Sequence, residues 1–511
     1  MMLERLLRKA WFPLSLRVLT LAVFIGLLVS LYTGSLRLPG IAIDSAVSMF
    51  LIWTLWWPLL YLSLPLAGRA WCGFLCPLSL ANETGNDLRT GKAVNLARWG
   101  FLAYVLFFVV VFLEQVSGLF LSPVVTLAFL AGSFGLAFLM GLAWRRLSFC
   151  KLVCPIGTLL GVFARLSPVG VRTDSGLCRA CKTFECLRGT EKAAPCPVYI
   201  NVPMIRSNKE CLVCAYCIKS CPYGSARIVP LAPGREISER RGFTLAESLF
   251  IIALLGLTAV LTSNGTSLLR KALSLSGIGL AGASLRGADF ILGLGLFLLA
   301  YGCVAAVSGW RGSSTLRERL ATFGYAYLPL TFFIMSFLIV FGFLGPVLPL
   351  GKDAIAIMKY LLVAAGLVWS LRLLFRMSRS LAEAAPHSLL LLGTSALWLL
   401  ALIPGPLALY TGTESVAVVL PGQSVNMDAF SMGFTPSTLI AQKGMPVVIN
   451  LTNVDINHAF DIDEFNVHLV IAGGRTGRVM FIPNRTGTFE IYCSVPGHRE
   501  AGMTATLIVE D

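Results

Sequence analysis

The chain has 511 residues, of which 56% are hydrophobic and only 13% are charged. A soluble protein of this length would carry about twice that charged fraction, so a soluble globular fold is excluded. The formal net charge of +15 comes from lysines and arginines that flank apolar runs, as on the cytoplasmic side of a membrane protein. No basic stretch is interleaved with aromatic residues, so we do not expect nucleic-acid binding.

Long apolar runs predict a multi-span α-helical membrane protein. The first run follows "MMLERLLRKA" and has no clean small-residue cleavage site, so we expect an uncleaved first helix. Nine runs are long enough to span a bilayer. They are residues 18–34, 46–67, 99–120, 123–143, 243–262, 289–308, 321–345, 355–374 and 387–404.

Basic residues set the expected orientation. They precede the first run and follow the second, fourth, sixth and eighth, and the positive-inside rule places these positions in the cytoplasm. The loop with Arg270, Lys271 and Arg286 is the exception. Nine spans from a cytoplasmic N-terminus place the C-terminus outside. We therefore expect an integral cytoplasmic-membrane protein whose last domain is periplasmic or extracellular.

Two cysteine pairs follow apolar runs at their cytoplasmic ends. "WCGFLCP" contains Cys72 and Cys76, and "FCKLVCP" contains Cys150 and Cys154. The C-x3-C spacing places both sulfurs on one face of a helical turn, and its repetition before proline argues against chance. Four thiolates could converge on an additional metal centre. Inert buried thiols and a structural or redox-active dithiol remain the alternatives.

The next cysteine group has the strongest spacing signal. In "CLVCAYCIKSCP", Cys211, Cys214, Cys217 and Cys221 form the C-x2-C-x2-C-x3-C-P run of a bacterial ferredoxin. The first three thiolates would hold one [4Fe–4S] cluster, and Cys221 would reach the other cluster. Zinc is the alternative, but zinc sites favour two well-separated C-x2-C pairs.

The partner cysteines lie upstream in "CRACKTFECLRGTEKAAPCP". Cys178, Cys181 and Cys186 would hold the first cluster together with Cys221. Cys196 would complete the second cluster. This half departs from the regular run because its third cysteine comes two residues late and nine residues precede its fourth. A cluster requires only that its four thiolates converge in space, so we still expect two [4Fe–4S] clusters with crossed fourth ligands.

Residues 60–230 resemble the NosR/NapH-type membrane-bound polyferredoxins, which combine two C-x3-C-P pairs with a ferredoxin segment. The resemblance implies electron transfer at the cytoplasmic membrane, from a cytoplasmic or membrane donor, in support of an extracytoplasmic metalloenzyme. NosR-type proteins also carry an N-terminal flavin domain. This chain starts at its first span, so no flavin is expected.

The second half of the membrane region has no comparable motif. Cys303 stands alone in the sixth run, where we expect it to pack. Of the four histidines only His387 is near a run, at its cytoplasmic end. A haem b in the bundle would need a histidine pair, so no haem is expected. A structural anchor for partner subunits is one role that stays open for 243–405.

The C-terminal region changes to period-two alternation, in "PVVINLTN", "GRVMFIP", "GTFEIYC" and "MTATLIVE". Such short strands predict a β-sandwich. His458, Cys493 and His498 form a His2Cys set, and Met503 supplies a weak axial ligand, as in type 1 copper sites. A β-sandwich that has lost its metal is the alternative. His468 has no matching partner, and we expect it on the surface.

This C-terminal pattern resembles a cupredoxin. The string "TNVDINHAFDIDEFNV" is also similar to the cupredoxin domain of cytochrome oxidase subunit II. The binuclear copper centre of that relative needs two cysteines, whereas Cys493 is the only cysteine after Cys303. We therefore expect one mononuclear copper ion.

These patterns together divide the chain into four expected domains. They are a transmembrane bundle with both C-x3-C-P motifs (1–171), a cytoplasmic ferredoxin-type segment (172–242), a second transmembrane bundle (243–405) and an external cupredoxin domain (406–511).

The expected function is electron transfer from the clusters to the copper, and on to an external copper or haem acceptor protein. No nucleophile–base set, phosphate loop or substrate pocket signature indicates bond chemistry, so whether the chain is an enzyme stays open. The alternative is copper handling, in which the chain is a cupric-reductase-type assembly factor for an external copper enzyme. Because the hydrocarbon core is about 30 Å thick, electron transfer also requires a relay centre.

Overall fold

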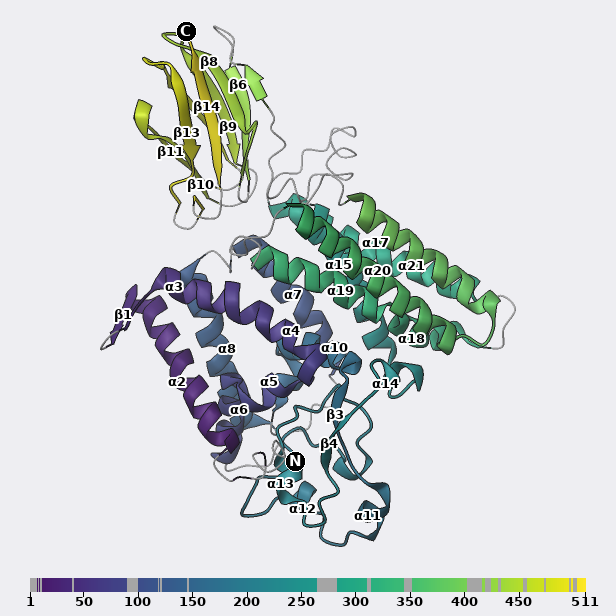
Figure 1. The fold of residues 1–511 in the computed structure, drawn as a ribbon. Helices are drawn as coiled ribbons and strands as arrows, with labels where there is room; N and C mark the ends of the chain where they lie inside the picture. The colour runs from purple at the N-terminus through teal and green to yellow at the C-terminus, as the bar shows by residue number, and fades with distance from the viewer. Residues whose placement is uncertain are drawn as a thin grey trace. The chain divides into compact units, whose positions relative to one another are not determined.

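The computed structural model forms two compact units, Met1–Gly256 with Leu294–Leu344 and Leu361–Thr394, and Leu257–Gly293 with Gly345–Tyr360 and Ser395–Asp511 (Figure 1). The described residues are 7, 9, 12–38, 41–89, 100–117, 119, 122–144, 147–263, 283–309, 314–343, 352–401, 416–418, 424–430, 433–453, 457–472, 475–495, 498–499 and 503–511.

Apolar helices form the N-terminal part of the first unit. In chain order they are α2 (Phe12–Thr33), α3 (Ser45–Met49), a π-helical segment (Phe50–Trp56), α4 (Trp57–Ala67), α5 (Ala70–Phe74), α6 (Pro77–Asp87), α7 (Leu102–Ser117), α8 (Pro123–Ala143), α9 (Ser148–Leu152) and α10 (Pro155–Phe163). Proline opens α6, α8 and α10, where its missing N–H costs no helical hydrogen bond. A hairpin of β1 (Ser35–Leu38) and β2 (Ile41–Asp44) separates α2 from α3.

Glycines allow α6 and α8 to approach closely. A Cβ on Gly85 would lie 2.2 Å from the carbonyl oxygen of Phe138, and one on Gly141 would lie 2.2 Å from that of Asn82. The Asn82 amide donates a hydrogen bond of 2.5 Å to the Ala137 carbonyl. Small residues at such contacts are typical of helix packing in membranes.

The second half of the membrane region continues with α15 (Leu245–Ser263), α17 (Ala283–Val307), α18 (Leu316–Phe323), a 3-10 turn (Gly324–Tyr327), α19 (Leu328–Phe343), α20 (Lys352–Met377) and α21 (Leu381–Ala401). Tyr61 of α4 stacks on Phe332 of α19, with ring centroids 5.3 Å apart, and donates a hydrogen bond to its carbonyl. The two expected bundles therefore touch through these residues, and their division into separate domains stays a prediction.

Six helices are long and apolar enough to cross a membrane, within the described residues. They are Leu14–Thr33, Val47–Ala67, Pro123–Ala143, Phe290–Val307, Leu316–Phe341 and Ala354–Met377. The expected runs 99–120 and 243–262 occur as the shorter apolar helices Leu102–Glu114 and Leu245–Val260, and 387–404 falls on α21. The expected multi-span helical fold is confirmed. The loop charges at Arg270 and Lys271 lie outside the described residues.

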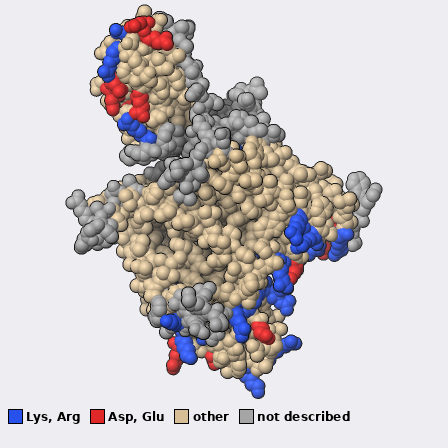
Figure 2. All heavy atoms as spheres, viewed as in Figure 1, with Lys and Arg blue, Asp and Glu red and all other residues tan. Residues whose placement is uncertain are grey.

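The ferredoxin segment is a small, loop-rich body built on one strand pair. β3 (Val169–Arg172) pairs antiparallel with β4 (Arg227–Pro230), and four short helices lie between and after them. These helices are α11 (Ser175–Ala180), α12 (Glu185–Arg188), α13 (Tyr216–Ser220) and α14 (Arg235–Ser238). Figure 2 shows lysines and arginines gathered over this part of the unit, with few charges over its apolar helices.

Buried ion pairs attach this segment to the helices. Glu247 of α15 accepts hydrogen bonds from Arg165 Nε at 2.8 Å and Lys209 Nζ at 2.7 Å. On the other side, Arg17 of α2 bonds both Glu83 of α6 and the hydroxyl of Tyr216, which lies between two cluster-motif cysteines. Removing one partner of a buried pair is strongly destabilising, so these contacts fix where the segment sits.

The second unit contains the predicted β-sandwich. Its larger sheet has the order β11-β10-β13-β14-β8-β5 and its smaller sheet the order β12-β9-β6-β7. The strands are β5 (Val416–Val418), β6 (Ser424–Phe430), β7 (Gly433–Thr435), β8 (Thr438–Gln442), β9 (Val447–Asn453), β10 (His458–Ile462), β11 (Val467–Ile471), β12 (Thr476–Phe481), β13 (Gly487–Tyr492) and β14 (Thr504–Glu510).

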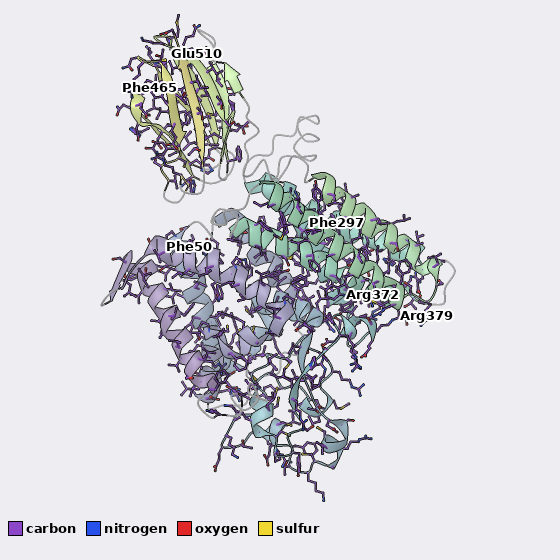
Figure 3. The ribbon with its side chains drawn as sticks, in the orientation of Figure 1. Phe50, Phe297, Arg372, Arg379, Phe465 and Glu510 are labelled. Carbon is purple, nitrogen blue, oxygen red and sulfur yellow. The ribbon has the colours of Figure 1, made fainter. Side chains whose placement is uncertain are left out.

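Alternating side chains of both sheets fill its core. In β9 every second residue, Val447, Ile449 and Leu451, is buried, and β14 buries Ala505, Leu507 and Val509 in the same way. Phe465, labelled in Figure 3, stacks on Phe481 in this domain. The four predicted strand segments are confirmed as β9, β12, β13 and β14.

Candidate metal centres

The predicted copper ligands come from three places in the sandwich. His458 opens β10, Cys493 follows directly after β13, and Met503 directly precedes β14. Backbone hydrogen bonds close the loop between the last two strands. The Cys493 N–H donates to the Met503 carbonyl at 3.2 Å, and the Met503 N–H donates to the His498 carbonyl at 2.9 Å.

Three ligand atoms converge in the core. His458 Nδ1 and His498 Nδ1 lie 3.1 Å apart, and Cys493 Sγ lies 3.3 Å from His498 Nδ1 and 4.0 Å from His458 Nδ1. All three side chains are buried, and so is Met503. Two imidazole nitrogens and one thiol, with a thioether beside them, fit the trigonal His2Cys copper site with a weak axial methionine.

The electrostatics of the pocket favour the thiolate. Burial opposes ionisation of Cys493, but hydrogen bonds from His458 and His498 and from the Ala459 N–H lower its pKa to about 6. The thiolate is the form that binds a metal. The chemistry of the donor set therefore fits copper, which supplies one-electron transfer when bound.

Asp461 connects the backbone next to Cys493 with His468 at the surface. Buried Asp461 accepts a hydrogen bond of 3.1 Å from the N–H of Ser494, the residue after Cys493. Its other carboxylate oxygen lies 2.9 Å from Nδ1 of His468. The His468 side chain is 54% exposed, as expected, but it has Asp461 as a partner, which its position in the sequence did not reveal.

The first thiol group of the ferredoxin segment lines a small pocket. Cys178, Cys181, Cys186 and Cys221 all contribute to its walls. Ser225 links two of them, since its hydroxyl lies 3.1 Å from Cys178 Sγ and its N–H donates to Cys221 Sγ at 3.3 Å. Burial, followed by the charges of Cys221, Cys178 and Cys181, raises the pKa of Cys186 to about 11.

The second thiol group is more deeply buried. Burial is the main cause that raises the pKa of Cys211 to about 11, and the neighbouring Cys196 adds to it. The pKa of Cys214 is also raised, by burial and then by Cys196 and Cys211. Burial and then these three thiols also raise the pKa of Cys217. Thiolates this close repel one another, and a bound metal cluster would offset that repulsion.

The two thiol groups are neighbours. The Cys196 N–H donates to the Cys186 carbonyl at 3.3 Å, and the charge of Cys186 also acts on Cys217. The structure thus brings Cys221 to the upstream cysteines and Cys196 to the downstream ones.

The C-x3-C pairs also come together. Cys76 and Cys154 are the residues immediately before Pro77 and Pro155, which open α6 and α10. Burial raises the pKa of Cys76 to about 12, and the thiols of Cys72 and Cys154 contribute further. Burial and then the thiols of Cys154, Cys76 and Cys72 raise the pKa of Cys150 in the same way. The four thiols are therefore near enough to influence one another electrostatically, and we refer to them as the four-cysteine group.

The segment that carries Cys72 and Cys76 packs against the loop that carries Cys211 and Cys214. A Cβ on Gly73 would lie 2.4 Å from the Leu212 carbonyl oxygen and 2.9 Å from the Cα of Cys214. Arg69 lies between the two groups, and its Nη1 donates to the Lys209 carbonyl at 2.8 Å. Its positive charge opposes the burial-driven rise in the pKa of Cys150, Cys154 and Cys211 alike.

Two families match the regions that contain these groups. The family described as "4Fe-4S binding domain" matches residues 49–93 and 125–172, and the family described as "Cupredoxin-like domain" matches residues 405–509. The chain combines a 4Fe-4S binding domain with a cupredoxin-like domain. The first match covers both C-x3-C-P pairs and ends before Cys178, so it bears on the four-cysteine group.

Curated relatives agree with this combination. The putative electron transport protein YccM of Escherichia coli is 26% identical over 37% of this chain and 58% of its own length. An uncharacterized protein of Methanocaldococcus jannaschii is 29% identical over 31% of this chain and 64% of its own length. This chain therefore spans less than two thirds of either relative. Cytochrome c oxidase subunit 2 of Thermus thermophilus is 25% identical over 19% of the chain and 74% of its own length.

Solved structures of small copper proteins match about a fifth of the chain. Auracyanin B is 20% identical over 19% of this chain and 95% of its own, with a TM-score of 0.17. Rusticyanin from Thiobacillus ferrooxidans is also 20% identical, over 19% and 82%, with a TM-score of 0.16. The cupredoxin-like domain itself is established by the family match and by the observed strands.

One residue behaves differently from expectation, and another has a contact that the sequence did not reveal. Cys303 is exposed on α17, so the prediction that it packs inside a span is wrong. His387 is fully buried in α21, and its Nδ1 lies 3.1 Å from the hydroxyl of Tyr327. Sequence reasoning missed Arg69 and Gly73, although both flank Cys72, because no spacing rule shows which distant loop they contact.

Proposed function

We propose that this protein passes electrons from two [4Fe–4S] clusters, through a further centre held by four cysteines, to one type 1 copper ion. The copper would then reduce an external copper or haem acceptor protein. The matched domains and the electron-transport relative support electron transfer in general. The number of clusters, the ligands, the direction and the partners are part of the proposal.

The observation that carries this proposal is the continuous series of thiol groups in the first unit. The first group touches the second through Cys186 and Cys196. The second group touches the four-cysteine group through Cys214 and Gly73. A series of neighbouring redox sites replaces one long electron transfer by several short ones, and that is what a conduit toward the membrane requires.

We assign the ligands residue by residue. Cys178, Cys181, Cys186 and Cys221 would hold the first cluster, and Cys196, Cys211, Cys214 and Cys217 the second. The further centre would be held by Cys72, Cys76, Cys150 and Cys154. The copper would be held by His458, Cys493, His498 and Met503. The match of the 4Fe-4S family to both C-x3-C-P pairs favours a cluster for the further centre.

The direction follows from the usual order of potentials. Cluster potentials range from about −700 to +450 mV and depend on charge and solvent exposure. Copper bound by soft sulfur in an apolar pocket is expected at higher potential than these clusters. Electrons would therefore run from the ferredoxin segment toward the copper. A partner centre, or approach of the copper domain to the membrane, would complete the path.

The test uses the full chain in proteoliposomes whose ferredoxin segments face a membrane-impermeant reductant. The measured quantity is the loss of the copper's visible absorbance. We expect bleaching in the parent protein and much slower bleaching in Cys72→Ser and Cys150→Ser. Cys303→Ser is the matched control, because that exposed cysteine belongs to none of the groups.

The same experiment separates conduction from copper handling. If the copper bleaches at the parent rate after loss of the clusters, the chain is not a conduit. Copper transfer to an apo copper protein, measured on the same samples, would then support the assembly-factor alternative. A conduit keeps its copper through repeated cycles.

A further inference from the structure

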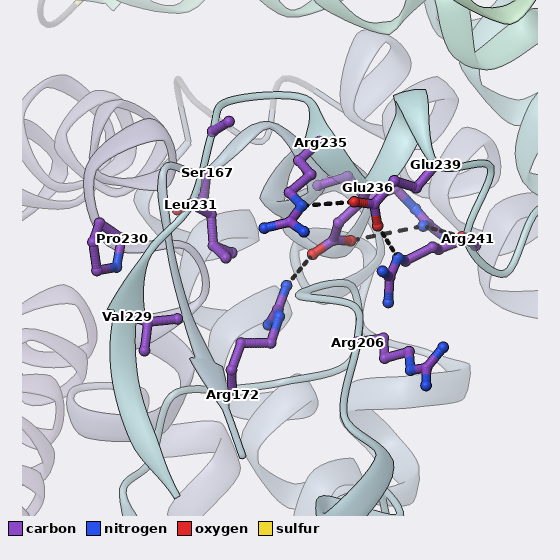
Figure 4. A pocket seen from close by; sticks show the side chains of 12 residues that line it. Ser167, Arg172, Arg206, Val229, Pro230, Leu231, Arg235, Glu236, Glu239 and Arg241 are labelled. Atoms are coloured by element: carbon purple, nitrogen blue, oxygen red, sulfur yellow. Dashed lines mark hydrogen bonds and ion pairs between the residues drawn. The ribbon is translucent and has the colours of Figure 1, made fainter. Parts of the chain in front are cut away.

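A pocket of about 300 Å³ lies in the ferredoxin segment, next to the end of the apolar helix Pro155–Leu166, which contributes Arg165 to its lining. One wall is apolar and comes from the end of β4, with Val229, Pro230 and Leu231 (Figure 4). Arginines of α14 and of neighbouring loops line the rest. None of the thiol groups contributes to this pocket.

The charge of the lining is strongly unbalanced. Five arginines face two glutamates, Glu236 and Glu239, so the lining has a formal excess of three positive charges. The arginines are Arg165, Arg172, Arg206, Arg235 and Arg241. Glu239 is shared by two of them, and Glu236 lies 2.8 Å from Arg172 and 3.9 Å from Arg165. Glu247, which does not line the pocket, also pairs with Arg165 at 2.8 Å, so the remaining surplus is carried by the other arginines.

Arg206 is the clearest example of an uncompensated positive charge in the pocket lining. It is exposed at the pocket, and within the described residues it has no ion-pair partner. Arg235 also keeps much of its surface free, since its side chain is 58% exposed despite its bond to Glu239. These two guanidinium groups can therefore donate to a ligand without breaking a buried ion pair.

The position of the pocket indicates which anion can reach it. Arg165 belongs to the apolar helix Pro155–Leu166, and Arg241 lies four residues before Leu245, where the apolar helix Leu245–Val260 begins. The pocket therefore lies where apolar helices meet the polar segment, at the level of lipid headgroups. Basic pockets of this kind bind anionic headgroups, and the apolar wall suits the adjoining glycerol and acyl carbons.

We propose that this arginine-lined pocket binds a phosphate-bearing anion, namely the headgroup of an anionic phospholipid. Arg206 and Arg235 are the principal phosphate ligands, because the guanidinium fork matches the geometry of a phosphate. The inference does not depend on the electron path.

The experiment measures binding to the purified, delipidated full-length protein in detergent. The probes are short-chain phosphatidylglycerol, short-chain phosphatidylcholine and inorganic phosphate, each titrated by calorimetry. We expect saturable binding of phosphatidylglycerol and none of phosphatidylcholine. The double variant Arg206→Gln/Arg235→Gln should bind about 30-fold more weakly, since each basic residue near an anionic headgroup contributes roughly a fivefold gain.

Two variants keep the result interpretable. Arg206→Gln alone removes an exposed, unpaired side chain, should fold normally and should weaken binding about fivefold. Arg227→Gln is the matched control, because Arg227 is exposed on the same strand as the apolar wall but does not line the pocket. Its affinity should equal that of the parent.

Three outcomes would overturn the proposal. Equal binding of phosphatidylcholine, or parent-like affinity in both Arg206 variants, would show that the pocket does not recognise the phosphate. If inorganic phosphate bound as tightly as phosphatidylglycerol, the pocket would recognise phosphate in general and not a lipid headgroup. The proposal is supported if phosphatidylglycerol binds more tightly than inorganic phosphate and phosphate displaces it only weakly.

Discussion

Met503 differs from the other copper-site residues in what it should control. It is fully buried at the start of β14, and its backbone is bonded to both Cys493 and His498. A weak axial ligand tunes the potential more than it holds the metal. Met503→Gln should therefore keep the visible colour and lower the copper potential, as measured by redox titration. Cys493→Ser should lose the colour, and His468→Ala should leave both colour and potential near the parent values.

Arg69 is the residue that connects two thiol groups electrostatically. It is almost completely buried, and among the described residues its Nε has no hydrogen-bond partner. Removing its charge should disfavour the reduced, more negative state of both neighbouring centres. Arg69→Gln should lower both potentials by tens of millivolts. Redox titration followed by EPR measures each centre.

Charge and packing at Arg69 can be separated by a conservative change. Arg69→Lys keeps the positive charge, so it should restore most of both potentials even if the bond to Lys209 weakens. If Lys and Gln variants shift the potentials equally, the role of Arg69 is structural rather than electrostatic.

At the scale of elements, the proposed crossed ligation would make the two cluster motifs depend on each other. Cys221 belongs to the downstream run but lies with the upstream thiols through Ser225. Cys221→Ser should damage the first cluster and largely spare the second, and Cys196→Ser should do the opposite. Iron analysis and EPR of anaerobically prepared protein distinguish the two. Loss of the second cluster alone in Cys221→Ser would contradict crossed ligation.

A change in the contact between α5 and the loop of Cys211 and Cys214 should affect only the second proposed cluster. A methyl group on Gly73 would meet the backbone of Leu212 and Cys214, which cannot move aside as a flexible side chain could. Overpacking of this kind typically costs about 1–3 kcal/mol. Gly73→Ala should therefore reduce the occupancy of the second cluster and leave the first. Gly132→Ala is the control, because nothing lies within 4 Å of its added Cβ.

Sequence patterns predicted the elements with strong local signals. Period-two alternation gave β9, β12, β13 and β14, and the length of apolar runs gave the main helices. The helix α10 was not predicted, because its nine residues are too few for a span. The contact of Gly73 with Cys214 joins residues far apart in the chain, and nothing local encodes it. The proposed ligands were predicted from their spacing, whereas the charges around them depend on packing, which spacing does not encode.

At the scale of the whole molecule, the number of membrane crossings decides where the metal centres face. Five of the predicted runs lie between the ferredoxin segment and the copper domain, and within the described residues they fall on α15, α17, α19, α20 and α21. An odd number of crossings puts the two ends on opposite faces. Arg372 lies in α20 and Arg379 lies two residues after its end, and from the positive-inside rule we expect this end of α20 in the cytoplasm (Figure 3).

Opposite exposure of the two polar domains can be measured with a membrane-impermeant amine reagent. Lys182 and Lys192 are exposed on the ferredoxin segment, and Lys443 is exposed on the copper domain. In inverted vesicles only the first two should be modified, and in right-side-out vesicles only Lys443, as read by peptide mass spectrometry. Solubilised protein, the control, should be modified at all three lysines. Modification of Lys192 and Lys443 from one face would contradict five crossings, and a conduit across the membrane would then be impossible in this chain.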